Sequence, residues 1–168
     1  MPYTIFAKKQ IISLTQFAAL LGVVLIAPIF HQQFITGSIV NAVLFLATIM
    51  LGWPAAVAIG TLPSLMAAGF GTLPSPLIPM IPFIITSNVI LIVIFFLLKN
   101  KNYWLAAGSG AILKFLFLFA TSTTLFTFLW PQKIAASMAT MMSWPQLYTA
   151  LLGSVVAFLA LKMLKSIR

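Results

Sequence analysis

The stretch GTLPSPLIPMIPFIITSNVILIVIFFLL, residues 71–98, decides the fold. Its first half predicts a stiff connection, because proline fixes φ and donates no backbone hydrogen bond, and it contains Pro74, Pro76, Pro79 and Pro82. The remainder is almost entirely apolar, and about 20 such residues span a bilayer as a helix. One amide, Asn88, lies near the middle of that run. An amide at this depth predicts a polar contact inside the protein.

The composition extends this interpretation to the whole chain. Of 168 residues, 62% are hydrophobic and 5% are charged, and the mean hydropathy is +1.18. These values are typical of a polytopic membrane protein. At roughly 20 residues a span, the length allows about six helices and almost no soluble domain. We therefore predict one integral membrane domain over residues 1–168.

Apolar runs separated by short polar or Pro/Gly segments predict an all-α bundle of six transmembrane helices. Their expected ranges are about 9–29, 37–51, 55–70, 79–98, 103–129 and 144–164. The first run is longer than a signal sequence and is predicted to stay as a helix. The polar segment 31–38 is predicted to be an exposed loop, and Pro63 is expected to kink the third helix.

The basic residues predict the orientation of the bundle. In a six-helix arrangement, the cytoplasmic side is the one rich in Lys and Arg. One side carries Lys8, Lys9, Lys99, Lys101, Lys162, Lys165 and Arg168, whereas only Lys133 and His31 fall on the other. Both termini are therefore expected in the cytoplasm. The segments 31–38, 71–78 and 130–143 are expected to face outward.

Missing residue types exclude several function classes. The sequence has no Asp, Glu or Cys and one His, so it lacks a carboxylate pair for acid–base catalysis and a cluster for metal binding. A proton relay through carboxylates is excluded as well. No phosphate-binding loop pattern is present, so any uphill transport needs energy from another protein. We expect neither an enzyme nor a cofactor, and no nucleic-acid binding, because the cations gather at helix ends.

Lys114 is the anomalous residue. It lies eleven residues into the fifth predicted helix, about 16 Å along at 1.5 Å per residue, where a lysine costs about 2.5–3.5 kcal/mol to insert. The sequence offers no carboxylate to pair with it. Three outcomes stay open: Lys114 snorkels to an interface, bonds to amides and carbonyls inside the bundle, or meets an acidic group of a ligand or partner.

Helix periodicity places Lys114 on an interior stripe of small and polar residues. That stripe contains Ala107, Gly110, Ala111, Lys114, Phe117, Thr121 and Thr124. A similar stripe on the sixth predicted helix contains Gln146, Thr149, Ala150, Gly153, Ala157 and Ala160. We predict that one cavity in the outer half of the bundle is lined by Asn41, Asn88, Lys114, Thr121 and Gln146. The alternative for each amide is structural bonding between helices.

The other candidate residues also have explanations that involve no ligand. Trp144 fits a ligand-stacking role, but more readily a membrane-interface belt. His31, alone in a polar segment, is more often solvated than functional. Ala18 and Gly22 form a small-xxx-small pair, which allows close approach either of another helix of this chain or of a partner protein.

Four segments together resemble the substrate-binding subunits, or S components, of energy-coupling factor (ECF) vitamin transporters. They are ITGSIVNAVLFLATIMLGWPAAVAIGTLPSLMAAG (35–69), LPSPLIPMIPFIITSNVILIVIFFLL (73–98), AILKFLFLF (111–119) and SWPQLYTALLGS (143–154). The resemblance covers nearly the whole chain. The short LG-x-P turn before the third helix and the proline-rich connection after it look especially similar.

The resemblance implies a function and partners. Such a subunit captures a micronutrient from outside a prokaryotic cytoplasmic membrane, joins a transmembrane coupling subunit and two cytoplasmic ATPases, and topples to release the substrate. Ala18 and Gly22 would then contact the coupling subunit. Together with the predicted cavity, the resemblance implies that substrate is bound by His31, Gln32, Asn41, Asn88, Lys114, Thr121, Trp144 and Gln146.

The identity of the substrate stays open at this point. A neutral or anionic molecule is favoured over a cation such as thiamine, because Lys114 could meet a carboxylate or phosphate. Two other functions remain as alternatives. One is a membrane assembly or scaffold subunit without a small-molecule ligand, and the other is a facilitator that works without ATPases.

Overall fold

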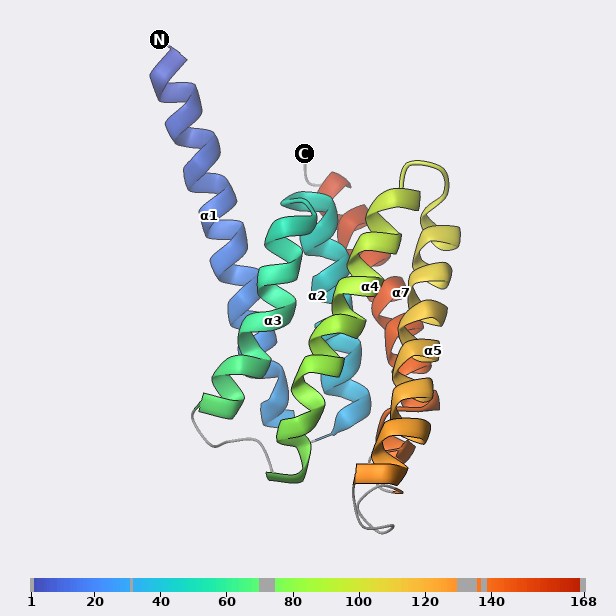
Figure 1. The fold of residues 1–168 in the computed structure, drawn as a ribbon. Helices are drawn as coiled ribbons and strands as arrows, with labels where there is room; N and C mark the ends of the chain where they lie inside the picture. The colour runs from blue at the N-terminus through green and yellow to red at the C-terminus, as the bar shows by residue number, and fades with distance from the viewer. Residues whose placement is uncertain (1, 31, 70–74, 130–135, 137–138, 167–168) are drawn as a thin grey trace.

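The computed structural model is a bundle of long helices (Figure 1). It describes residues 2–30, 32–69, 75–129, 136 and 139–166, and within these ranges it contains helices and no strand. The long helices are α1 (Pro2–Ile26), α2 (Gln33–Met50), α3 (Trp53–Gly69), α4 (Ile81–Leu98), α5 (Tyr103–Leu129) and α7 (Trp144–Ser166). Two short 3-10 helices, η1 (Ala27–Phe30) and η2 (Ser75–Met80), precede α2 and α4.

The prediction of an all-helical, membrane-spanning chain is confirmed at this level. In the described ranges, five segments are long and apolar enough to cross a membrane; they lie at Lys8–Phe30, Gln33–Met50, Ile78–Leu98, Tyr103–Thr124 and Ala139–Ser166. The apolar part of α3, Trp53–Met66, is shorter. The chain is therefore a multi-pass membrane protein by length and composition.

The prediction of an exposed loop at 31–38 was wrong for residues 33–38, because α2 begins at Gln33. The polar side chains here find partners without leaving the helix. Ser38 Oγ donates to the Phe34 carbonyl at 2.7 Å, and Thr36 Oγ1 donates to the Ala27 carbonyl at 3.0 Å. A polar segment whose hydroxyls bond to nearby backbone carbonyls can remain helical.

Two other boundaries differ from expectation for reasons of proline chemistry. The first α-helix ends at Ile26, and the chain continues as η1 through Pro28. Part of the predicted loop at 71–78 is η2, which begins at Ser75, and α4 then starts at Ile81 with Pro82 in its first turn. Proline is tolerated there because the first helical N–H groups have no partner within the helix.

Glycines permit the closest helix contacts. A Cβ added at Gly153 of α7 would lie 2.8 Å from the Ala42 nitrogen and 2.9 Å from the Ser38 carbonyl oxygen of α2. A Cβ at Gly110 of α5 would lie 3.1 Å from the Leu91 carbonyl oxygen of α4. These distances leave no room for a side chain, so α2 contacts α7, and α4 contacts α5, almost backbone to backbone.

The two ends of the bundle differ in charge. The start of α1, the connection between α4 and α5 and the end of α7 all lie at the same end (Figure 1). The described lysines that flank these points are Lys8, Lys9, Lys99, Lys101, Lys162 and Lys165. The starts of α2, α4 and α7 lie at the opposite end, which we call the non-basic end (Figure 1).

We predict that Gly153→Ala destabilises the protein, because its methyl group must displace the α2 backbone. Overpacking of this kind costs about 1–3 kcal/mol, so the melting temperature in detergent should fall by several degrees. Gly108→Ala on α5 is the matched control, since a Cβ there meets nothing within 4 Å. Equal melting temperatures for the two variants would contradict the tight α2–α7 contact.

Candidate functional site

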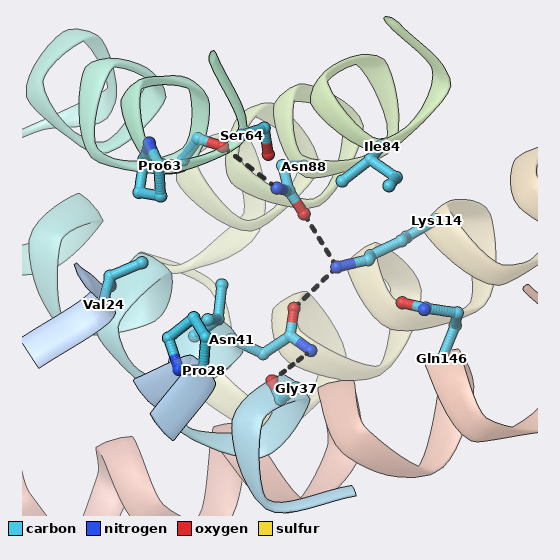
Figure 2. Close-up of a pocket in the computed structure, with 12 residues that line it drawn as sticks. Val24, Pro28, Gly37, Asn41, Pro63, Ser64, Ile84, Asn88, Lys114 and Gln146 are labelled. Carbon is cyan, nitrogen blue, oxygen red and sulfur yellow. Dashed lines mark hydrogen bonds between the residues drawn. The ribbon is translucent and has the colours of Figure 1, made fainter. Parts of the chain in front are cut away.

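Lys114 lies in the interior of the bundle and is only 4% exposed. Its Nζ donates to Asn41 Oδ1 at 2.7 Å and to Asn88 Oδ1 at 2.8 Å. Figure 2 shows the amino group between these two amides, which come from α2 and α4. Of the three outcomes considered for Lys114, the structure shows hydrogen bonding inside the bundle and not snorkelling to an interface.

Backbone and hydroxyl acceptors hold the two amides in orientation. Asn41 Nδ2 donates to the Gly37 carbonyl at 2.8 Å and to Thr149 Oγ1 at 3.4 Å. Asn88 Nδ2 donates to the Gly60 carbonyl at 3.2 Å. With their N–H groups engaged in this way, both amides present oxygen to the lysine, which is a hydrogen-bond donor.

The electrostatics of this cluster are unusual because the chain has no acidic residue. A buried ammonium usually has a carboxylate partner, whereas here two neutral amides face it. Within the described residues, every buried side-chain nitrogen and oxygen has a hydrogen-bond partner. The cluster is therefore satisfied in hydrogen bonds, but the protein offers no counter-charge to Lys114 in its protonated form.

A cavity of about 230 Å³ adjoins the amino group of Lys114. All six long helices contribute to its wall, together with η1. The lining residues are Val24, Pro28, Gly37, Val40, Asn41, Gly60, Pro63, Ser64, Ile84, Asn88, Lys114 and Gln146. Because many of them lie near the starts of α2, α4 and α7, the cavity is displaced toward the non-basic end of the bundle (Figure 1).

Four of the predicted site residues line this cavity, namely Asn41, Asn88, Lys114 and Gln146. The prediction that polar groups at matched depth meet in one place therefore agrees with the structure at these positions. Figure 2 shows the Gln146 side chain close to Lys114. Gln146 Nε2 donates to the Met141 carbonyl at 3.3 Å and contacts Met142 Sδ at 3.9 Å.

The other predicted site residues lie elsewhere. Thr121 is half-buried, and its hydroxyl donates to the Phe117 carbonyl of its own helix at 2.8 Å. Trp144 is 56% exposed, and its ring lies 5.1 Å from that of Phe115. Gln32 is exposed and precedes α2. His31 lies outside the described residues.

Sequence reasoning missed the contribution of α3 to the site. Gly60 was not among the predicted site residues, yet its carbonyl accepts the hydrogen bond that orients Asn88. A Cβ there would lie 3.1 Å from Leu44 Cδ2, so a larger residue would have to displace the Leu44 side chain. The one available signal was a face of small residues on α3, formed by Gly60, Ser64 and Ala67 at i, i+4 and i+7, because small residues allow another helix to approach closely.

On α1, Ala18 and Gly22 are not packed against the rest of the chain. Ala18 is exposed, and a Cβ at Gly22 would meet nothing within 4 Å. The alternative in which this pair serves internal packing is therefore not seen in the structure. The face stays open for lipid or for another protein.

The chemistry available to the cavity is that of binding. Within the described ranges, no group of three or more His, Cys, Asp or Glu residues could hold a metal ion. The cavity brings together one amino group, three amides, one hydroxyl and an apolar wall. This set can orient a ligand that carries a hydrogen-bond acceptor.

We predict that Asn88→Leu lowers stability by removing one of the two acceptors of Lys114. A hydrogen bond to a charged group contributes about 1.5–3 kcal/mol. Adding Lys114→Met in the same background should recover much of the loss, because replacing both partners by apolar groups is nearly neutral. Thr121→Val serves as the control. If the melting-temperature changes of Asn88→Leu and Lys114→Met were strictly additive in the double variant, the proposed energetic coupling between Asn88 and Lys114 would be contradicted.

Known proteins give no further guide to this site. Comparisons with family models, with curated proteins and with solved structures find no match. The function must therefore be argued from the geometry of the Lys114 cavity and from the pattern of the sequence.

Proposed function

We propose that this chain is the substrate-capturing transmembrane subunit of an ECF-type importer for a vitamin or related micronutrient. The observation that carries the proposal is the cavity beside Lys114, which combines a buried amino group with an apolar wall. Binding pockets for small molecules have this character, being mostly apolar with a few placed polar groups. The protein would take its substrate through the non-basic end of the bundle.

We further propose that six helices cross the membrane and that both termini lie in the cytoplasm. In this arrangement α3 is the sixth, short span; it lies beside α2 and α4 (Figure 1). The lysines at the basic end then satisfy the positive-inside rule. This orientation turns the non-basic end, and with it the cavity, toward the outside of a prokaryotic cytoplasmic membrane.

The energy for import would come from partner proteins. The sequence has no carboxylate for proton coupling and no phosphate-binding loop, so a transmembrane coupling subunit and two cytoplasmic ATPases would supply it. The open face around Ala18 and Gly22 is where the coupling subunit would dock. Small residues favour such contacts in membranes because they let two backbones approach closely.

The second candidate, a scaffold subunit without a ligand, is favoured by one observation. Asn41 and Asn88 already satisfy two donors of Lys114, so the cluster has a structural use. Against it, a buried charge whose only task is packing is readily replaced by apolar residues. The cavity beside the cluster also has no role in this alternative.

We predict that the purified protein carries a small molecule, which native mass spectrometry followed by solvent extraction should detect. Val40→Phe should abolish this bound mass, because Val40 lines the cavity and the larger ring would fill it. Leu152→Phe, on an exposed position of α7, should retain it. A protein that folds but never carries a ligand, even from rich medium, would favour the scaffold function.

We also predict that Gly22→Leu weakens association with the coupling subunit, because a branched side chain would hold the partner helix away. The chain's own fold should tolerate the change, as the space at Gly22 is open. Ala19→Leu, at an exposed neighbouring position, is the control. Equal recovery of the coupling subunit with both variants would argue against docking at this face.

A further inference from the structure

We propose that the ligand of the Lys114 cavity is a compact monocarboxylate with an otherwise apolar body. This inference rests on the proposed function, in that a small molecule occupies the cavity. The inference further specifies the charge of that molecule, the number of its polar groups and its size. Each of these follows from a separate feature of the wall.

The negative charge that we assign to the ligand follows from the missing counter-ion of Lys114. No Asp or Glu exists anywhere in the sequence to neutralise it, and the two oxygens that contact Nζ belong to neutral amides. The lysine is 4% exposed, so water and salt do little to screen its charge. A ligand that carries one negative charge would supply the missing partner, whereas a cation would be repelled.

The number of polar groups follows from the donors that remain. An ammonium has three N–H donors, of which two are directed to Asn41 and Asn88. Both amide N–H groups of Asn41 are engaged, with Gly37 and Thr149, and one of the two N–H groups of Asn88 is engaged with Gly60. The third N–H of Lys114 is thus left for the ligand.

Gln146 supplies a second donor on the wall. Its Nε2 contacts Met142 Sδ at 3.9 Å, and sulfur is a weak acceptor that an anionic oxygen can replace. In the proposed complex one carboxylate oxygen accepts from Lys114, and the other accepts from Gln146 in place of the sulfur. A phosphate dianion brings a second negative charge, for which the wall offers no second cation.

The body of the ligand follows from the remaining wall. Apart from the hydroxyl of Ser64, the side chains opposite the polar cluster are apolar and come from Val24, Pro28, Val40, Pro63 and Ile84. These side chains provide no hydrogen-bond partner for a second charged group or for the hydroxyl groups of a polyol. The volume of about 230 Å³ lies below the 300–1,000 Å³ usual for drug-sized ligands, which favours a compact molecule over one as large as a corrinoid.

The test is a calorimetric titration of the ligand-stripped protein in non-ionic detergent. The probes are benzoate, cyclohexanecarboxylate and octanoate, each paired with its neutral primary amide, and phthalate as a dianion. We expect at least one acid to bind ten-fold or more tightly than its amide and than phthalate. Equal binding of acids and amides, or binding of no acid, would overturn the inference.

An isosteric variant tests the role of charge without removing Lys114. Asn88→Asp places a carboxylate beside the amino group, so it should weaken acid binding at least ten-fold while the protein remains folded. Lys101→Gln is the control, because it lowers the net charge of the protein at an exposed site far from the cavity wall. Unchanged acid affinity in a folded Asn88→Asp protein would also overturn the inference.

The outcome for the proposed function is read separately, from the molecule extracted from the native protein. A neutral, cationic or polyhydroxylated molecule would leave substrate capture in place and reject the monocarboxylate. Absence of any extracted molecule, together with no binding of any probe, would reject both proposals. An extracted monocarboxylate would support both.

Discussion

The requirement to satisfy a buried amino group in a chain without acidic residues organises the centre of this structure. Lys114 obtains its acceptors from Asn41 on α2 and Asn88 on α4, which ties three helices together at one depth. Each amide is in turn oriented by a backbone carbonyl, one from α2 and one from α3. Lipid offers no alternative hydrogen-bond partners for such groups. Substituting any one of these residues therefore leaves the polar groups of the others without a partner.

Close helix contacts make this arrangement possible. Gly153 lets α7 lie directly against the α2 backbone next to Asn41, and Gly110 does the same for α5 against α4. The space left beside the polar cluster is a cavity at the non-basic end of the bundle. A site with one central cation and an apolar wall is suited to selecting a ligand by charge and size, which is the task that we propose for it.

The sequence predicted the helices well because their apolar runs are long and proline or charge separates them. It also predicted the meeting of Asn41, Asn88, Lys114 and Gln146, since matched depth and an interior stripe require only the 3.6-residue period. Helical periodicity shows which face of a helix points inward, but not which neighbouring helix packs against that face. For this reason Thr121 was expected in the cavity, and Gly60 was missed as a hydrogen-bond acceptor. The start of α2 was missed because the hydroxyls at its beginning bond to nearby backbone carbonyls, which composition does not reveal.

The most direct test of the central claim is an experimental structure of the protein purified with whatever it carries from the cell, at a resolution that shows side chains. The account predicts Lys114 between the two amides, with density for a small molecule within hydrogen-bond distance of Nζ and against the apolar wall. Lys114 directed to the membrane surface, or a closed cluster with side chains filling the cavity, would contradict it.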